Sequence, residues 1–85
     1  MAKPPTLTLE QAFGQVIREL RLQKGLSQEA LSFACQRHRT YVSLIERGKN
    51  SPSIRTVWLL AEGLETAPEE IIRRTAMLRV ADRAE

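Results

Sequence analysis

The stretch from Ser27 to Lys49 limits the possible folds of this chain more than any other, because helix-starting and helix-ending residues alternate within it. Ser27 can cap one helix, and Glu29 lies in its first turn, where a carboxylate favours the exposed backbone N–H groups. A second helix is predicted from Arg39 onward, and Gly48 can end it because glycine reaches the left-handed conformation without steric cost. The apolar residues that we expect to join these helices are Leu31, Val42 and Ile45. The stretch therefore predicts two short helices connected by a tight turn.

A helix is also predicted before this stretch, over residues 9–24. Thr8 can cap it, and Gln11 three residues later completes a capping box. Gly25 follows the last turn, where a left-handed residue would end the helix. The apolar residues at the spacing of a core-facing stripe are Phe13, Val16, Ile17 and Leu20. One face of this helix is therefore expected to be buried.

Two more helices are predicted after the stretch. Ser53 can cap a helix over residues 54–64, and Thr66 with Glu69 forms a capping box for a helix that starts at residue 67 or 68 and ends near residue 80. No strand-like alternation occurs. We therefore expect an all-α fold, a compact five-helix domain over residues 8–81. Residues 82–85 are expected to fray, and residues 1–7 to form a flexible arm, either a simple frayed terminus or a basic arm that reaches for a groove.

Composition narrows the possible functions. The chain has 85 residues, enough for one small domain, and its net charge of +3 permits nucleic acid or an anionic membrane as a partner. The apolar run at residues 57–60 is far shorter than the roughly 20 residues of a membrane span. One cysteine and one histidine provide neither a disulfide nor the ligand set of a structural zinc site. We expect no enzymatic activity, no metal, no cofactor and a cytoplasmic location.

Charge is segregated along the chain. Between residues 37 and 61 the only acidic residue is Glu46. The basic residues of the same segment are Arg37, Arg39, Arg47, Lys49 and Arg55. Such segregation is typical of a nucleic-acid-binding surface, and it also fits a solvated basic face without a partner.

The motifs of this chain resemble the Cro/repressor-type (XRE-like) helix-turn-helix family from about Phe13 to Ile71. The matching motifs are Ser27-Gln28-Glu29, Tyr41-Val42-Ser43, Ile45-Glu46-Arg47-Gly48-Lys49 and Pro52-Ser53. The resemblance implies a lambda-repressor-like domain with the helix-turn-helix at about residues 28–47. Within the family, the segments Arg39-Thr40-Tyr41 and Gly63-Leu64-Glu65 look most like the controller proteins of restriction–modification systems.

The resemblance implies a DNA-binding transcriptional regulator whose second motif helix enters the major groove of double-stranded DNA. The positions that match base contacts are Arg39, Thr40, Ser43 and Leu44. Arg39 has the fork that pairs with guanine O6 and N7. The positions expected to contact phosphate are Gln28, Tyr41, Arg47, Lys49 and Asn50. Arg21 and Glu46 match a buried ion pair of the family; the alternative is two independent surface charges.

The turn between the two motif helices departs from the family pattern. Gln36 stands where glycine is usual, so the turn is expected to be built differently, because a left-handed glutamine is strained. Arg37 replaces a buried aliphatic residue, and His38 replaces a capping Ser or Thr, so it either caps the helix or reaches a phosphate. Cys35 occupies a position that matches a core leucine of the family. It is either an inert buried thiol or a redox sensor.

The family gains specificity by dimerising on half-sites, so we expect a homodimer. The interface candidates are Trp58, Leu59, Ile72, Met77 and Leu78. Alternatively, these residues complete a small core. The regulator would act by occluding a promoter or by contacting RNA polymerase. A second hypothesis is an interaction module, an antitoxin or a bridging factor with a toxin or another protein as its main partner.

Overall fold

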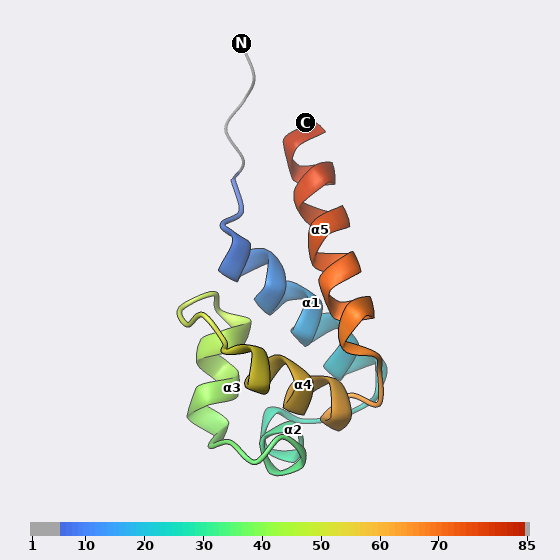
Figure 1. Cartoon of the computed structure of the whole chain (residues 1–85). Coiled ribbons are helices and arrows are strands. Elements are labelled where there is room, and N and C mark those ends of the chain that lie inside the picture. Colours follow the sequence, from blue (N-terminus) through green and yellow to red (C-terminus); the bar gives the residue numbers. More distant parts are fainter. Residues whose placement is uncertain (1–5, 85) are drawn as a thin grey trace.

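The computed structural model describes residues 6–84 and contains five helices (Figure 1). They are α1 (Leu9–Gln23), α2 (Gln28–Ala34), α3 (Arg39–Glu46), α4 (Ile54–Gly63) and α5 (Pro68–Ala84). No strand occurs in this part of the chain, so the expected all-α class is confirmed. None of the described helices is long and apolar enough to cross a membrane.

The first, second and fourth helices begin at the expected caps. Thr8 accepts from the backbone N–H of Gln11, and the Gln11 side chain accepts from the backbone N–H of Thr8, which completes the predicted capping box. Ser27 and Ser53 accept backbone N–H groups of the first turns of α2 and α4. These short-range bonds satisfy donors that would otherwise lack an intrahelical partner.

The first four helices end in the same way, with one residue in the left-handed region after the cap. These residues are Gly25, Gln36, Gly48 and Glu65, with φ of 70°, 58°, 70° and 53°. In each case the backbone N–H of the following residue donates to a carbonyl five residues back, as in the bond from Leu26 N to Arg21 O. This Schellman arrangement satisfies the last carbonyls and turns the chain sharply. Two of the four ends use a residue with a side chain, which costs conformational energy that glycine avoids.

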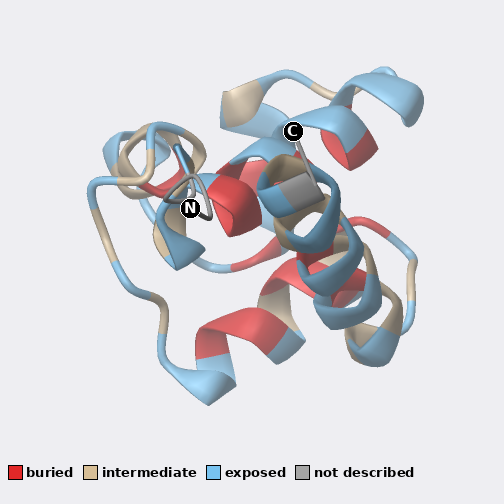
Figure 2. Cartoon of the chain, turned by 90° about the horizontal axis from the view of Figure 1, so that it is seen from above, coloured by how far each residue is buried: buried red, intermediate tan, exposed pale blue. Residues whose placement is uncertain are grey.

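The core lies between α1 and the other helices. α1 packs against α3 and α5, while α2 packs against α3 and α4. Figure 2 shows the buried parts of the helices turned toward the centre of the molecule. The fully buried apolar side chains include Ile17, Leu31, Val42, Ile45, Leu60, Leu64 and Ile71. Leu31, Val42 and Ile45 thus join α2 and α3 as predicted.

Cys35 belongs to this core and has no exposed surface. Its Sγ lies 3.8 Å from the Ser32 carbonyl oxygen. Burial raises the pKa of the Cys35 thiol, because the charged thiolate loses its hydration there. The thiol is therefore neutral and enclosed. Of the two alternatives, this supports an inert core residue over a redox sensor, since reactivity requires an accessible thiolate.

The C-terminal helix is longer than predicted. α5 continues to Ala84 instead of ending near Val80, so residues 82–84, which were expected to fray, are helical in the structure. The Asp82 carboxylate accepts from the backbone N–H groups of Thr6 and Leu7 and from the Thr6 hydroxyl. These bonds also hold the end of the expected flexible arm, whose residues 1–5 lie outside the described residues. The contact joins residues far apart in sequence, so helical periodicity does not reveal it.

Candidate nucleic-acid interface

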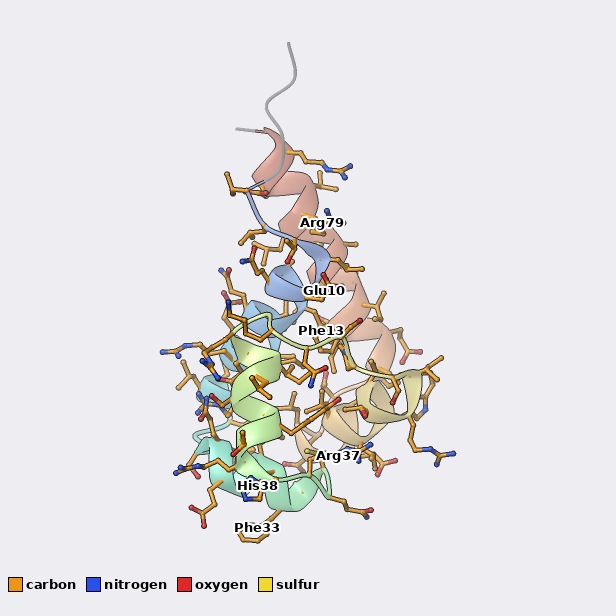
Figure 3. All side chains as sticks on the ribbon, turned by 90° about the vertical axis from the view of Figure 1, so that its left-hand side faces the viewer. Glu10, Phe13, Phe33, Arg37, His38 and Arg79 are labelled. Carbon is orange, nitrogen blue, oxygen red and sulfur yellow. The ribbon has the colours of Figure 1, made fainter. Side chains whose placement is uncertain are left out.

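The third helix has one buried and one outward face. Val42 and Ile45 have no exposed surface, while Arg39 and Thr40 are exposed and Ser43 and Leu44 are partly exposed. α3 lies across the front of the molecule in Figure 3. All four residues expected to contact bases therefore share the outer side of α3. A helix with this exposure can enter the major groove, which is about 12 Å wide.

The C-terminal end of α3 lies directly on the backbone of α1. A Cβ atom on Gly14 would lie 2.2 Å from the Ile45 carbonyl oxygen and 2.8 Å from that of Glu46. Gly14 is itself buried. Because backbone atoms cannot move aside as a side-chain tip can, only glycine fits this contact. The contact fixes the separation of α1 and α3.

A buried ion pair reinforces this anchor. Arg21 Nε lies 2.6 Å from Glu46 Oε2, and Arg21 Nη2 lies 3.1 Å from Glu46 Oε1. The two side chains are only 9% and 2% exposed. Arg21 Nη1 also donates to the Leu26 carbonyl oxygen at 2.8 Å. Arg21 and Glu46 are thus paired and are not two independent surface charges, and the one acid of the basic segment is neutralised.

Gln28 joins the same network, which the sequence did not indicate. Its Nε2 donates to Glu46 Oε1 at 3.1 Å. The bond connects the first residue of α2 to the last residue of α3. A side-chain amide has two N–H donors, so one remains for another acceptor such as a phosphate.

The turn between α2 and α3 follows the usual backbone path despite its unusual residues. Gln36 adopts the left-handed conformation, with φ of 58°, so the expectation of a differently built turn is wrong. The reason is the Schellman bond from Arg37 N to the Ser32 carbonyl oxygen at 2.9 Å, which requires this conformation at Gln36. His38 caps α3, because its Nδ1 accepts from the Thr40 backbone N–H at 3.1 Å. Of the two roles considered for His38, the structure shows capping.

The cations near α3 are free of acidic partners. Among residues 6–84, no ion pair is formed by Arg39, Arg47, Lys49 or Arg55. Arg47 caps the C-terminal end of α3, and Lys49 and Asn50 lie in the loop that leads to α4. Tyr41 is partly buried and packs against the core, so only part of its side chain is accessible. Unpaired cations at both ends of a helix suit a polyanion such as DNA.

The expected dimer residues are divided between different parts of the surface. Trp58, Ile72 and Met77 are 52%, 53% and 58% exposed, whereas Leu59 and Leu78 pack against the core. Trp58 and Ile72 line one shallow groove between α4 and α5. Met77 and Leu78 line another groove, on the side of α5 that faces α1. One flat interface does not include all five residues.

A cluster of charged side chains lies beside these two grooves, and its member Arg73 lines both of them. Glu70 pairs with Arg73 at 2.6 Å and with Arg74 at 2.8 Å. Hydrogen bonds from the two guanidinium groups lower the pKa of Glu70 to about 2. The cluster is partly exposed, and Glu70 stays ionised near neutral pH.

A further groove was not indicated by the sequence. It has a volume of about 440 Å³ and lies between the start of α1, the loop before α4 and the end of α5. Its apolar lining includes Leu9, Phe13, Val57, Ile72 and Val80. Figure 3 shows Glu10, Phe13 and Arg79 along this side. Because α5 is longer than predicted, its last turns extend the groove beyond the residues that periodicity assigned to the helix.

These features define a class of protein, a compact all-α domain with an outward recognition helix among unpaired cations. Residues 17–71 match the Helix-turn-helix family HTH_3, and the chain belongs to this family.

The names of similar proteins indicate a narrower group within this class of DNA-binding domains. Control protein C.BamHI of Bacillus amyloliquefaciens is 39% identical over 66 residues, which are 76% of this chain and 82% of that protein. The crystal structure of the restriction-modification controller protein C.AhdI from Aeromonas hydrophila is 44% identical, with a TM-score of 0.72, over 73% of this chain and 94% of that one. Wild-type C.Esp1396I, also a restriction-modification controller protein, is 29% identical, with a TM-score of 0.80, over 88% and 97%.

Further solved structures are variants of C.Esp1396I. They replace an arginine, a threonine and a tyrosine that follow one another in its chain. The family and these relatives together show a DNA-binding transcriptional regulator of the controller type. The names of these relatives describe control proteins.

Proposed function

We propose that this protein controls transcription by binding an operator in double-stranded DNA as a homodimer, with α3 of each copy in the major groove. The observation that carries the proposal is the outward face of α3. This face presents four side chains to solvent beside cations that have no acidic partner among the described residues. Such a face supplies direct base readout at its centre and phosphate neutralisation at its edges.

Arg39 is the residue expected to give the strongest base readout. It is exposed at the first position of α3 and makes no ion pair among the described residues. Its guanidinium can donate two hydrogen bonds to one guanine. Thr40, Ser43 and Leu44 supply hydroxyl and apolar contacts from the same face. The order Arg39-Thr40-Tyr41 repeats the three residue types altered in the C.Esp1396I variants, which supports this assignment.

The phosphate contacts are assigned to residues around this face. Arg47, Lys49 and Asn50 follow the end of α3, and Gln28 opens α2 with one amide N–H donor still available. Tyr41 lies at the third position of α3 and is partly buried. These groups would fix the register of the protein on the duplex without reading its sequence.

For the homodimer we favour the side of the molecule that carries Trp58 and Ile72. Both side chains are about half exposed and line one groove, an arrangement that suits burial against a second copy. Leu59, Met77 and Leu78 would then lie at the edge of the interface or outside it. Sedimentation velocity at micromolar concentration should show a dimer, and Ile72→Arg should convert it to a monomer that still unfolds cooperatively. A wild-type monomer at these concentrations contradicts the proposed assembly.

The names of C.BamHI and C.AhdI indicate which genes the operator could control. We propose that the target is the promoter of a restriction–modification system and that the protein acts in the cytoplasm. Selection of bound sites from random DNA tests the proposal directly. The expected product is a two-fold symmetric sequence with half-sites about one helical turn apart.

The salt dependence of binding separates this function from that of an interaction module. Affinity for the selected duplex should fall by orders of magnitude between about 50 and 200 mM salt, because each neutralised phosphate releases counterions. A protein that selects no sequence, and whose main contacts are apolar, would instead be an antitoxin or bridging module.

A further inference from the structure

Arg37 is the residue in the helix-turn-helix whose role the proposed function leaves open. It follows the left-handed Gln36, at a position where helices with this ending usually place an apolar residue against their own last turn. Arg37 is exposed instead, and Figure 3 shows it beside the N-terminal half of α3 and next to α4. At this turn the chain therefore has a guanidinium group in place of the usual apolar contact.

The guanidinium of Arg37 is held by two contacts. Its Nη2 donates to Thr56 Oγ1 at 3.1 Å, and its Cζ lies 5.4 Å from the centre of the Tyr41 ring. Thr56 is 1% exposed, and its hydroxyl is also hydrogen-bonded to the Ser53 hydroxyl at 3.0 Å. The acceptor on α4 is therefore fixed, and Arg37 is not a freely moving surface cation.

The Tyr41 ring is thereby confined on two sides. It packs against the hydrophobic core on one side, and the Arg37 guanidinium lies over it as a cation over an aromatic face. Tyr41 is in the first turn of α3, next to the exposed Arg39 and Thr40. Confinement of the ring restricts the directions in which its hydroxyl can point.

We propose that Arg37 is a positioning residue for DNA binding: it holds the Tyr41 ring between the core and its own guanidinium, so that the phenol hydroxyl is already directed at the sugar-phosphate backbone. The inference rests on the proposed function, because it assigns a use to Tyr41 at the DNA surface. Pre-ordering this side chain removes part of the entropy that binding would otherwise cost.

Two other roles for Arg37 predict different changes in affinity, salt dependence and melting temperature. If its guanidinium neutralises a phosphate directly, its removal lowers the slope of log affinity against log salt by about one. If its bond to Thr56 only stabilises the fold, its removal lowers the melting temperature and leaves the affinity of the folded protein unchanged. A positioning role lowers affinity at an unchanged slope, and it does so only while Tyr41 has its hydroxyl.

The experiment is a double-mutant cycle on the full chain with the selected duplex, using Arg37→Met, Tyr41→Phe and the double variant. Methionine keeps an unbranched apolar stem and removes the guanidinium. We expect Arg37→Met to weaken binding about two- to fivefold, the loss of one cation–aromatic contact, and to cause no further loss in the Tyr41→Phe background. Arg83→Met is the matched control, since Arg83 is an exposed arginine in the last turn of α5 with no ion pair among the described residues.

The free protein gives an independent measurement. Tyr41 is the only tyrosine, so its ring signals in an NMR spectrum are unambiguous. We expect Arg37→Met to average the Tyr41 side chain over several rotamers, while Arg83→Met leaves it in one. Equal losses of affinity in both Tyr41 backgrounds, a slope lowered by one, or an unchanged rotamer would each overturn the inference while the proposed function stands. Failure of the wild-type chain to select any sequence would instead overturn the proposed function.

Discussion

The two ends of α3 are held in different ways. At the C-terminal end, the backbone of Ile45 and Glu46 lies on Gly14, and the Glu46 carboxylate is buried with Arg21. At the N-terminal end, an exposed histidine caps the helix and Arg37 bridges to α4 across the surface. One end is fixed by close backbone contact and buried charge, and the other by hydrogen bonds near solvent.

This difference suits a helix whose direction is fixed at one end and whose other end can adjust its position. Close contact and a buried ion pair at the C-terminal end set the direction of α3 relative to α1. The N-terminal end carries Arg39 and Thr40, and contacts near solvent open at a lower free-energy cost than buried ones. Substitutions at the C-terminal end should therefore act mainly on folding, and substitutions at the N-terminal end mainly on recognition.

The largest effect is expected from Glu46→Ala. It leaves the Arg21 guanidinium buried without its carboxylate, which should lower the free energy of unfolding by about 3–5 kcal/mol. Urea denaturation measures the change, and Glu62→Ala on the exposed side of α4 is the control. An unfolding midpoint within error of the wild-type value would mean that the pair does not anchor α3.

Gly14→Ala tests the backbone contact at the same end. The new Cβ would lie 2.2 Å from the Ile45 carbonyl oxygen, so α1 and α3 must separate. We expect a loss of roughly 1–3 kcal/mol in stability, the usual cost of overpacking, together with weaker binding to every duplex. Gln15→Ala at an exposed neighbouring position should change neither quantity. Unchanged stability in Gly14→Ala would show that the two helices can move apart freely.

Arg39→Ala tests base readout at the N-terminal end of α3. Because Arg39 is exposed and makes no ion pair among the described residues, the variant should melt at the wild-type temperature. It should lose about 1–3 kcal/mol of discrimination at one base pair of each half-site, measured by competition between duplexes. Lys49→Ala, at the other end of α3, should weaken binding to all duplexes alike and lower the salt slope by about one. A uniform loss in both variants would place base readout elsewhere.

The sequence predicted the parts of the fold that depend on neighbours along the chain. The capping box of Thr8 and Gln11 and the glycine that ends α3 were identified, because the interacting groups lie within one helical turn. The pairing of Arg21 with Glu46 followed only from the resemblance, since no local pattern connects these positions. The bonds from Thr6 to Asp82 and from Arg37 to Thr56 were missed for the same reason. α5 was predicted too short because its end is fixed by such a contact.

The exposure of the proposed dimer residues was predicted only in part. The sequence left all five candidates as either interface or core residues. Trp58, Ile72 and Met77 are exposed, whereas Leu59 and Leu78 pack against the core. The sequence did not reveal that Met77 lies in a different groove from Trp58 and Ile72. That division depends on how α5 packs against α1 and α4, which is a property of the assembled fold.

The smallest effect is expected from Gln36→Gly, at the turn before α3. Glycine removes the strain of a left-handed glutamine, about 1–2 kcal/mol, but it also increases the entropy of the unfolded chain, which offsets roughly half of that gain. The net result should be a stabilisation of about 0.5–1 kcal/mol and a melting temperature a few degrees higher. Glu65→Gly, at the matching position after α4, should stabilise by a similar amount without changing DNA affinity. If Gln36→Gly is more stable but binds DNA more weakly than Glu65→Gly, the stiffness of this turn contributes to recognition, and the N-terminal end of α3 is less adaptable than its contacts indicate.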